Sequence, residues 1–279
     1  MRPVLLPRDL AGLWRALEEH PDAAILAGGT DLLVGLRAGH RDPPALVGLE
    51  RLAELKGARH QKGGLWLGAA STHQELLDDP LVAAELPLLR LALAGLGSPP
   101  IRHMGTLGGN IVTASPAGDC LPPLYVHEAE VEIISPAGAR RQGLDDFILG
   151  PGRVDMRPGE VLAGVLVPLG RRFDHVHQRK VGLRRALAIA VCSFCAGLCL
   201  DGAGRVERAR LAWGSLAPTV ARPREVERLL EGQVLGEDLL IEAGRLLQGH
   251  ISPIDDLRAS AAYRRRVAAN LLLGLLDQA

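Results

Sequence analysis

The spacing of apolar residues predicts short strands alternating with helices over roughly the first 170 residues. Leu10, Leu13, Trp14 and Leu17 recur at helical intervals, and Asp9 stands where an N-cap would begin that helix. Compact apolar runs follow at residues 23–27, 45–49, 65–70, 131–135 and 161–167. Because these runs are short and show little alternation, we interpret them as strands, the first of them buried.

Further helix signals lie between residues 32 and 96. An apolar stretch at 32–36 predicts a helical turn, and Thr72 with Glu75 has the spacing of a capping box. Residues 81–96 have a helical composition, which Pro87 is expected to interrupt. Residues 97–123 are rich in Gly and Pro and predict no regular element. Since so long a loop is uncommon inside a compact domain unless it has a function, this segment is a functional candidate.

The pattern changes after residues 168–172. Three strands are predicted at 173–181, 187–200 and 206–213, followed by three helices at 224–230, 238–247 and 257–276. Strands followed by helices are typical of an α+β domain with the helices on one face of an antiparallel sheet. We therefore expect two domains, at residues 1–168 and 172–279.

Composition narrows the class of protein. The 279 residues include 32 Lys and Arg and 32 Asp and Glu, so the formal net charge is zero. A nucleic-acid coat protein needs excess cations, and an aromatic content of 3% leaves little for base stacking, so no nucleic-acid partner is expected. No apolar run reaches the ~18–20 residues of a membrane span, and no signal peptide is visible. With only four cysteines, a cytoplasmic protein is expected.

A first candidate binding motif is the segment Ala27-Gly28-Gly29-Thr30-Asp31, between a predicted strand and a helical turn. Two adjacent glycines let backbone N–H groups face a concavity, which suits phosphate oxygens, and Thr30 adds a hydroxyl donor. The alternative is an ordinary strand-to-helix turn in which Thr30 or Asp31 is the N-cap. On this motif alone both interpretations stay open.

A second motif of the same type, Thr106-Leu107-Gly108-Gly109-Asn110, is followed by Asp119. Two separate glycine cradles match a dinucleotide, whose phosphates and sugar hydroxyls need several donors, and Asp119 could accept from those hydroxyls. The alternative is an irregular loop in which Asn110 and Asp119 only cap turns. Neither motif has the spacing of a Rossmann or P-loop fingerprint.

The cysteines and histidines do not indicate a metal site. Cys192 and Cys195 have a suggestive spacing, but on a strand they would point to opposite faces and could not easily hold one ion. Buried free cysteines are common small hydrophobes. No zinc-protease histidine motif or serine-hydrolase elbow is present. We expect no metal ligands and name no catalytic acid or base.

Taken together, the motifs resemble the FAD-binding medium subunits of molybdenum hydroxylases, the family of aerobic carbon monoxide dehydrogenases and of the flavin domain of xanthine dehydrogenase. Segments 27–32, 101–111 and 114–119 carry the resemblance. It continues through Pro158-Gly159-Glu160, Gln178-Arg179-Lys180 and Tyr263-Arg264, and so covers essentially the whole chain in order. His103 departs from the family pattern, in which Asn is common.

The resemblance implies an α+β fold: a two-lobed FAD-binding domain of the PCMH type, its lobes dividing near residues 55–65, and then the C-terminal domain. It also implies FAD as the cofactor, with its pyrophosphate held by the two glycine loops. Asp119 would meet the ribityl chain or the ring, Leu96 and Leu162 would line an apolar pocket, and Lys180 would approach the flavin from the second domain. The residues implied to bind the cofactor are Leu26, Ala27, Gly28, Gly29, Thr30, Asp31, Leu32, Leu96, Thr106, Leu107, Gly108, Gly109, Asn110, Asp119, Leu162 and Lys180.

By the same resemblance, the protein is a flavoprotein subunit that receives electrons from a 2Fe–2S subunit and passes them to an external acceptor. A large subunit would hold the molybdenum cofactor, and the assembly would be a dimer of heterotrimers. Two alternatives stay open: a stand-alone FAD-dependent oxidoreductase of related fold, and an assembly subunit that has lost its flavin. The glycines of both loops argue against the second alternative.

Overall fold

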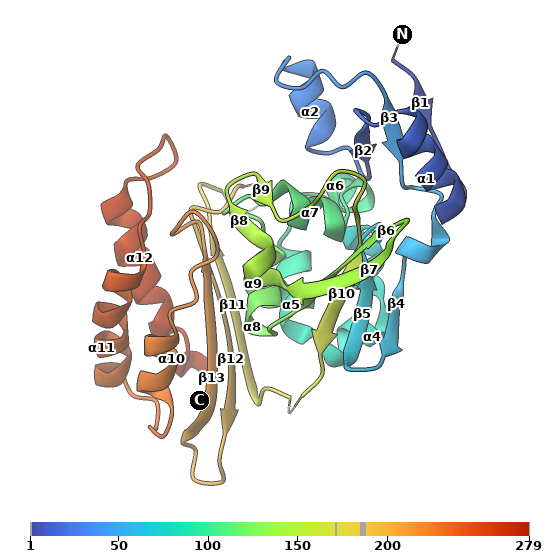
Figure 1. Ribbon diagram of the computed structural model, residues 1–279. Coiled ribbons are helices and arrows are strands. Elements are labelled where there is room, and N and C mark those ends of the chain that lie inside the picture. Colours follow the sequence, from blue (N-terminus) through green and yellow to red (C-terminus); the bar gives the residue numbers. More distant parts are fainter. Residues whose placement is uncertain (1, 171, 185–187, 279) are drawn as a thin grey trace.

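The first sheet of the computed structural model, which describes residues 2–170, 172–184 and 188–278, is small and parallel. Its strands β1 (Val4–Leu5), β3 (Leu46–Gly48) and β2 (Ala24–Leu26) lie side by side in that order (Figure 1). Helices α1 (Leu10–Glu19) and α2 (Leu32–Arg37) belong to this part. Asp9 caps α1 as predicted, accepting a hydrogen bond from the Gly12 N–H at 2.7 Å.

The second sheet is antiparallel, in the order β4-β5-β10-β6-β7. Its strands are β4 (Ala58–Gln61), β5 (Gly64–Gly68), β10 (Val161–Pro168), β6 (Glu130–Ser135) and β7 (Gly138–Gly143). Packed around it are α3 (His73–Asp78), α4 (Pro80–Glu85), α5 (Pro87–Ala94), α6 (Pro99–Met104), α7 (Leu107–Thr113), α8 (Leu121–Val126) and α9 (Leu144–Phe147). The short hairpin β8 (Ile148–Gly150) and β9 (Arg153–Val154) and the 3-10 turn Ala53–Leu55 complete this part. The predicted break at Pro87 is confirmed, since α4 ends at Glu85 and α5 begins at Pro87.

The C-terminal part is the predicted three-stranded antiparallel sheet with helices on one face. The strands are β11 (His175–Val181), β12 (Cys192–Leu200) and β13 (Val206–Gly214), and the helices are α10 (Arg224–Leu230), α11 (Glu237–Leu247) and α12 (Ala261–Leu273). The 3-10 turns Gln248–His250 and Leu276–Gln278 follow α11 and α12. Leu187, the first residue of the predicted middle strand, lies outside the described residues.

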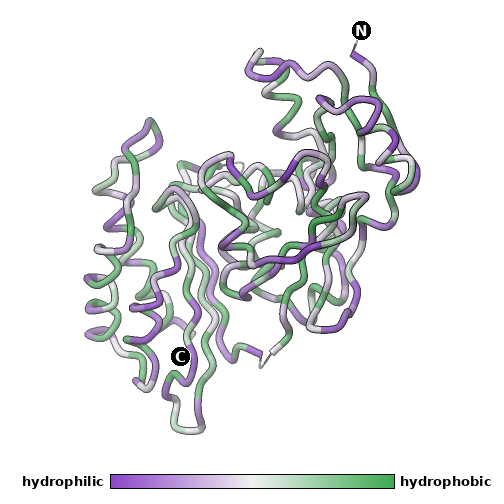
Figure 2. Tube along the Cα trace, in the orientation of Figure 1, coloured by the Kyte–Doolittle hydropathy of each residue, from purple (hydrophilic) through white to green (hydrophobic). Residues whose placement is uncertain are grey.

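This sheet is buried on both faces, so it joins the two halves of the molecule. Cys192 and Phe194 pack against the C-terminal helices, whereas Cys195 packs into the core of the N-terminal half. The predicted opposite orientation of Cys192 and Cys195 is therefore confirmed. Figure 2 shows hydrophobic stretches along the middle of the sheet, as burial on both sides requires.

The prediction that residues 97–123 lack regular structure is wrong. Helices α6, α7 and the first half of α8 occupy this segment. Their signals were weak because two begin with proline in the first turn and α7 contains Gly108 and Gly109, which disfavour helix. Tertiary packing stabilises these short helices, since all six residues of α8 and the interior-facing residues of α7 are buried. The last helix is also shorter than predicted, beginning at Ala261 rather than 257.

The capping box at the start of α3 offers a test of the local fold. The Thr72 hydroxyl accepts from the Glu75 N–H at 3.1 Å, and the Glu75 carboxylate accepts from the Thr72 N–H at 2.7 Å. We expect Thr72→Ala to lower the free energy of unfolding by about 1 kcal/mol, because one N-terminal N–H loses its acceptor. Chemical denaturation measures this change. Thr72→Ser keeps the hydroxyl and is the control; equal losses in both variants would contradict the assignment.

Candidate functional site

The two glycine motifs, nearly 80 residues apart in sequence, meet in space. A Cβ atom on Gly28 would overlap the carbonyl group of Met104 and would lie 2.9 Å from the Gly105 Cα atom. Met104 ends α6, and Gly105 leads directly into the second motif. Gly28 is therefore required for the close approach of two backbones rather than for contact with a ligand.

The first motif, residues 27–31, presents a run of unused donors. Within the part of the chain that the structure describes, the backbone N–H groups of residues 28–32 make no hydrogen bond to protein. Gly29 adopts φ +71°, a left-handed conformation that turns the chain toward α2. Asp31 occupies the N-cap position of α2, as the alternative interpretation predicted, but its side chain makes no capping hydrogen bond. Successive free N–H groups of this kind suit an anionic ligand.

The backbone of the second motif is hydrogen-bonded to residues 69–73, and its two glycines have different roles. Leu107 N–H donates to the Ser71 carbonyl at 3.0 Å, and Gly108 N–H donates to the Ala69 carbonyl at 2.8 Å. A Cβ on Gly108 would press on Ala69, at 2.7 Å from its Cβ, so Gly108 is needed for internal packing. A Cβ on Gly109 would meet only the Thr106 Oγ1, at 3.0 Å. Gly109 thus presents the open side of the motif, but its N–H donates to the Thr106 hydroxyl at 3.1 Å and the Asn110 N–H donates to the Thr106 carbonyl at 3.0 Å. The expectation that the N–H groups of this second loop are available to a ligand is therefore wrong for residues 107–110.

A third group of predicted residues lies beyond α7. The Asn110 Oδ1 accepts from the Cys120 N–H at 3.3 Å, which shapes the turn that carries Asp119. Asp119 does more than cap a turn, because its Oδ2 lies 2.6 Å from the Nζ of Lys180 on β11. Lys180 also donates to the Gly95 carbonyl at 3.4 Å, next to Leu96. Burial raises the pKa of Asp119, and the Lys180 ammonium opposes that shift.

The structure therefore brings most of the predicted residues into two neighbouring groups. Gly28 meets residues 104 and 105, which lead into the second motif, and Asn110 holds the turn that carries Asp119. Asp119 in turn pairs with Lys180, which contacts Gly95 beside Leu96. Leu96 and Leu162 are buried in the same core cluster as Leu107, with exposed fractions of 6% and 4%. Leu32 is buried as well, whereas Thr30 and Asp31 are exposed.

Sequence reasoning missed His73, which lies beneath the second motif. The backbone N–H of His73 donates to the Gly105 carbonyl at 2.9 Å, and the ring Nδ1 lies 3.8 Å from the Cys120 Sγ. Burial, aided by the Arg102 charge, lowers the pKa of His73 to about 4, so the imidazole is neutral at pH 7. The capping box placed His73 at a helix start, but nothing in the sequence indicated that this helix supports the second motif.

Among the described residues, no group of three or more His, Cys, Asp or Glu side chains could hold a metal ion. A search of the same residues also finds no helix that is long and apolar enough to cross a membrane.

Comparison with known proteins yields two family matches that together span nearly the whole chain. Residues 1–170 match the FAD binding domain in molybdopterin dehydrogenase, and residues 177–279 match the CO dehydrogenase flavoprotein C-terminal domain.

Individual relatives agree with these matches. The chain is 30% identical to the xanthine dehydrogenase FAD-binding subunit of Escherichia coli O157:H7, over 97% of this chain and 93% of the relative. It is 28% identical to the carbon monoxide dehydrogenase medium chain of Afipia carboxidovorans, over 92% and 89%. The structure superposes on quinoline 2-oxidoreductase from Pseudomonas putida 86 with a TM-score of 0.94, 29% identity and coverage of 100% and 96%.

The buried neutral His73 predicts a pH dependence of stability. Its folded-state pKa of about 4 lies below the ordinary 6.5, so its contribution is full above pH 6.5 and is lost as pH falls toward 4. We expect His73→Gln to remove up to about 3 kcal/mol of the acid-induced loss in unfolding free energy over this window. Denaturant titrations at several pH values measure the slope. His60→Gln, at an exposed position on β4, is the control, and identical slopes for wild type and His73→Gln would refute the prediction.

Proposed function

Because the chain belongs to the family of FAD-binding domains of molybdopterin dehydrogenases, we propose that it is the flavoprotein subunit of a molybdenum-containing hydroxylase or dehydrogenase complex. In this role it receives electrons from a 2Fe–2S subunit and passes them to an external acceptor. The observation that supports this most directly is the meeting of the two glycine loops, with five successive free N–H groups on the first.

The residues present fit FAD. The backbone of residues 28–32, the Thr30 hydroxyl and the open side of Gly109 would hold the pyrophosphate, which needs several donors and no bulky side chains. The neighbouring residues of both loops would hold the backbone of these donors in position; they are Leu26, Ala27, Gly28, Leu107 and Gly108. FAD, when bound, supplies two-electron redox chemistry, and the chain's task is to bind and orient it.

The second group of residues would meet the remainder of the cofactor. Asp119 would accept from ribityl hydroxyls or face the ring, and Lys180 would lie close to the flavin from the C-terminal domain. Leu96 and Leu162 would contribute apolar lining. Asp119 and Lys180 are each 15% exposed at the side chain, so their charges act in a partly desolvated environment where they influence a bound group more strongly.

We propose the domain organisation and the partners together. The domains are residues 1–168, with two lobes that divide near 55–65, and residues 172–279. The gap between β3, which ends at Gly48, and β4, which begins at Ala58, supports the division into lobes.

The relative from Afipia carboxidovorans is named a medium chain, which supports partner subunits, and we propose a dimer of heterotrimers. The four cysteines are buried free thiols, which supports a cytoplasmic location.

A glycine substitution tests the cofactor site. We expect Gly109→Val to reduce FAD binding strongly, because its side chain would extend from the open side of the second motif while disturbing only Thr106. Visible absorption of the purified protein after incubation with FAD measures the retained flavin. Gly202→Val, at an open position in the turn between β12 and β13, is the matched control. Equal flavin content in both variants would show that the site is elsewhere.

Gly28→Val should also lose FAD, but for a different reason. Its side chain would separate the two loops by striking the backbone of residues 104 and 105, so thermal stability falls along with flavin content. Gly109→Val should keep most of the wild-type thermal stability. Differential scanning calorimetry distinguishes the two, and a Gly28→Val protein with wild-type stability would contradict the packing role of Gly28.

The composition of the native complex tests the proposed partners. Affinity purification of the tagged chain from its native host should recover an iron–sulfur subunit and a molybdenum-cofactor subunit, detected by mass spectrometry and metal analysis. Recovery of a flavin-loaded chain with no such partners would favour the stand-alone oxidoreductase instead.

A further inference from the structure

Helix α8 lies at the interface between the N-terminal half of the molecule and the C-terminal sheet. All six of its residues, Leu121–Val126, are buried. It packs against β12 and β13 of the C-terminal sheet, and a Cβ on Gly214 of β13 would lie 3.3 Å from Pro122. Asp119 lies just before α8 and Glu128 lies just after it, so both ends of the helix carry an acidic residue.

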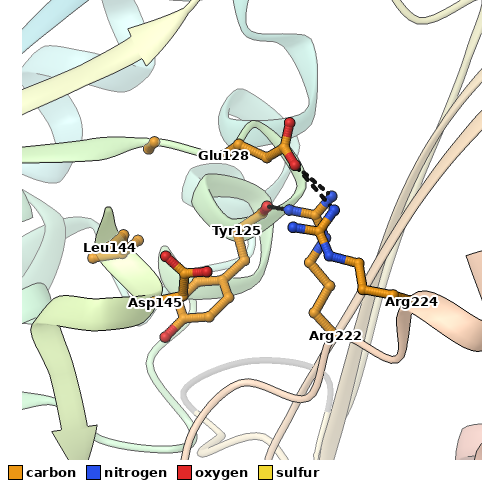
Figure 3. Close-up of a pocket in the computed structure, with 7 residues that line it drawn as sticks. Tyr125, Glu128, Leu144, Asp145, Arg222 and Arg224 are labelled. Carbon is orange, nitrogen blue, oxygen red and sulfur yellow. Dashed lines mark hydrogen bonds and ion pairs between the residues drawn. The ribbon is translucent and has the colours of Figure 1, made fainter. Parts of the chain in front are cut away.

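Side chains of the C-terminal domain form ion pairs or hydrogen bonds at both of these ends. At the start, Lys180 of β11 pairs with Asp119 at 2.6 Å. At the end, the Arg222 Nη1 donates to the Tyr125 carbonyl at 2.8 Å, and its Nη2 donates to the Glu128 carboxylate at 3.1 Å. Figure 3 shows Arg222 and Arg224 reaching together toward Glu128 and the end of α8.

Arg222 is itself firmly anchored. Its Nε donates to the Glu227 carboxylate at 2.9 Å, and the same Glu227 oxygen accepts from the Leu211 N–H of β13 at 2.8 Å. The Arg222 side chain is 9% exposed and that of Glu227 is 3% exposed. Charge-assisted hydrogen bonds at such low exposure are strong and directional, so they transmit the position of β13 to the end of α8.

Glu128 lies where the chain leaves α8, and backbone hydrogen bonds from Glu128 N–H to the Tyr125 carbonyl and from Ala129 N–H to the Leu124 carbonyl close this end of the helix. Glu128 has φ +54°, a left-handed conformation that non-glycine residues adopt only when their surroundings enforce it. On the other side of the arginines lies a cavity of about 160 Å³, lined in part by Tyr125, Leu144 and Asp145. Arg222 and Arg224 line this cavity too, so their contacts with Glu128 and Tyr125 supply side-chain restraints where packing is incomplete.

We propose that Arg222 is a positioning residue for the flavin site: by fixing the end of α8 while Lys180 holds its start, it sets the position of Asp119. This inference rests on the proposed function, which places Asp119 and Lys180 beside FAD. If α8 shifts, the Asp119–Lys180 pair loosens and the Lys180 ammonium is less neutralised. An uncompensated cation favours the more negatively charged reduced form of FAD.

The test uses Arg222→Met in the full chain, with the affinity for FAD and the midpoint potential of bound FAD as readouts. We expect FAD to bind about tenfold more weakly, because the loosened Asp119 and Lys180 side chains must then be ordered when FAD binds. The midpoint potential should rise. Arg222→Lys should restore part of both changes. Arg228→Met, which removes an exposed ion pair with Glu225 on the same helix α10, should change neither.

Outcomes separate the two proposals. Wild-type protein that binds no FAD would overturn the proposed function itself. If wild type binds FAD but Arg222→Met keeps its affinity and potential, even with lower thermal stability, Arg222 is only structural and this inference fails. Should Arg222→Met not fold, Glu128→Gln decides, because it weakens the same contact from the other side while Arg222 keeps its bonds to Glu227 and Tyr125. Glu128→Gln should shift both readouts in the same direction, and unchanged values would overturn the inference.

Discussion

The contact between Gly28 and the backbone of Met104 and Gly105 is the constraint on which the candidate site depends. A side chain at position 28 would overlap protein backbone, which cannot move aside as a flexible side chain can. This approach brings the first motif, with the free N–H groups of residues 28–32, against the residues that lead into the second motif. Without it, the two motifs would be separate turns far apart in the fold.

The second motif is held in place by residues 69–73 and, through the turn that carries Asp119, by the C-terminal part of the chain. His73, Ser71 and Ala69 hold its backbone from one side, and Asn110 fixes the turn that leads to Asp119. The C-terminal sheet then presents Lys180 to Asp119 and Arg222 to the other end of α8. Because the sheet buries both of its faces, its register determines where these charged groups reach the first half. Burial of charges is tolerated here because each has a partner at hydrogen-bond distance.

Local signals in the sequence predicted much of the fold. Asp9, Thr72 with Glu75, and Pro87 act through hydrogen bonds or steric clashes within a few residues, so they could be interpreted without tertiary knowledge. The same holds for the strands of the C-terminal sheet. Helices α6 to α8 could not be predicted in this way, because proline, Gly108 and Gly109 weaken their intrinsic preference and burial in the tertiary fold stabilises them.

The sequence by itself determined the family and its FAD cofactor, because the motifs that carry the resemblance are local runs of residues that can be compared without a structure. Tertiary structure alone decided what each glycine does: Gly28 and Gly108 face protein backbone, whereas Gly109 faces open space. It also decided the partners of Asp119 and Arg222, which lie 61 and 97 residues away along the chain. The reason is physical: whether a glycine or a charge meets a ligand, solvent or another backbone depends on which distant segments the packed sheets bring against it.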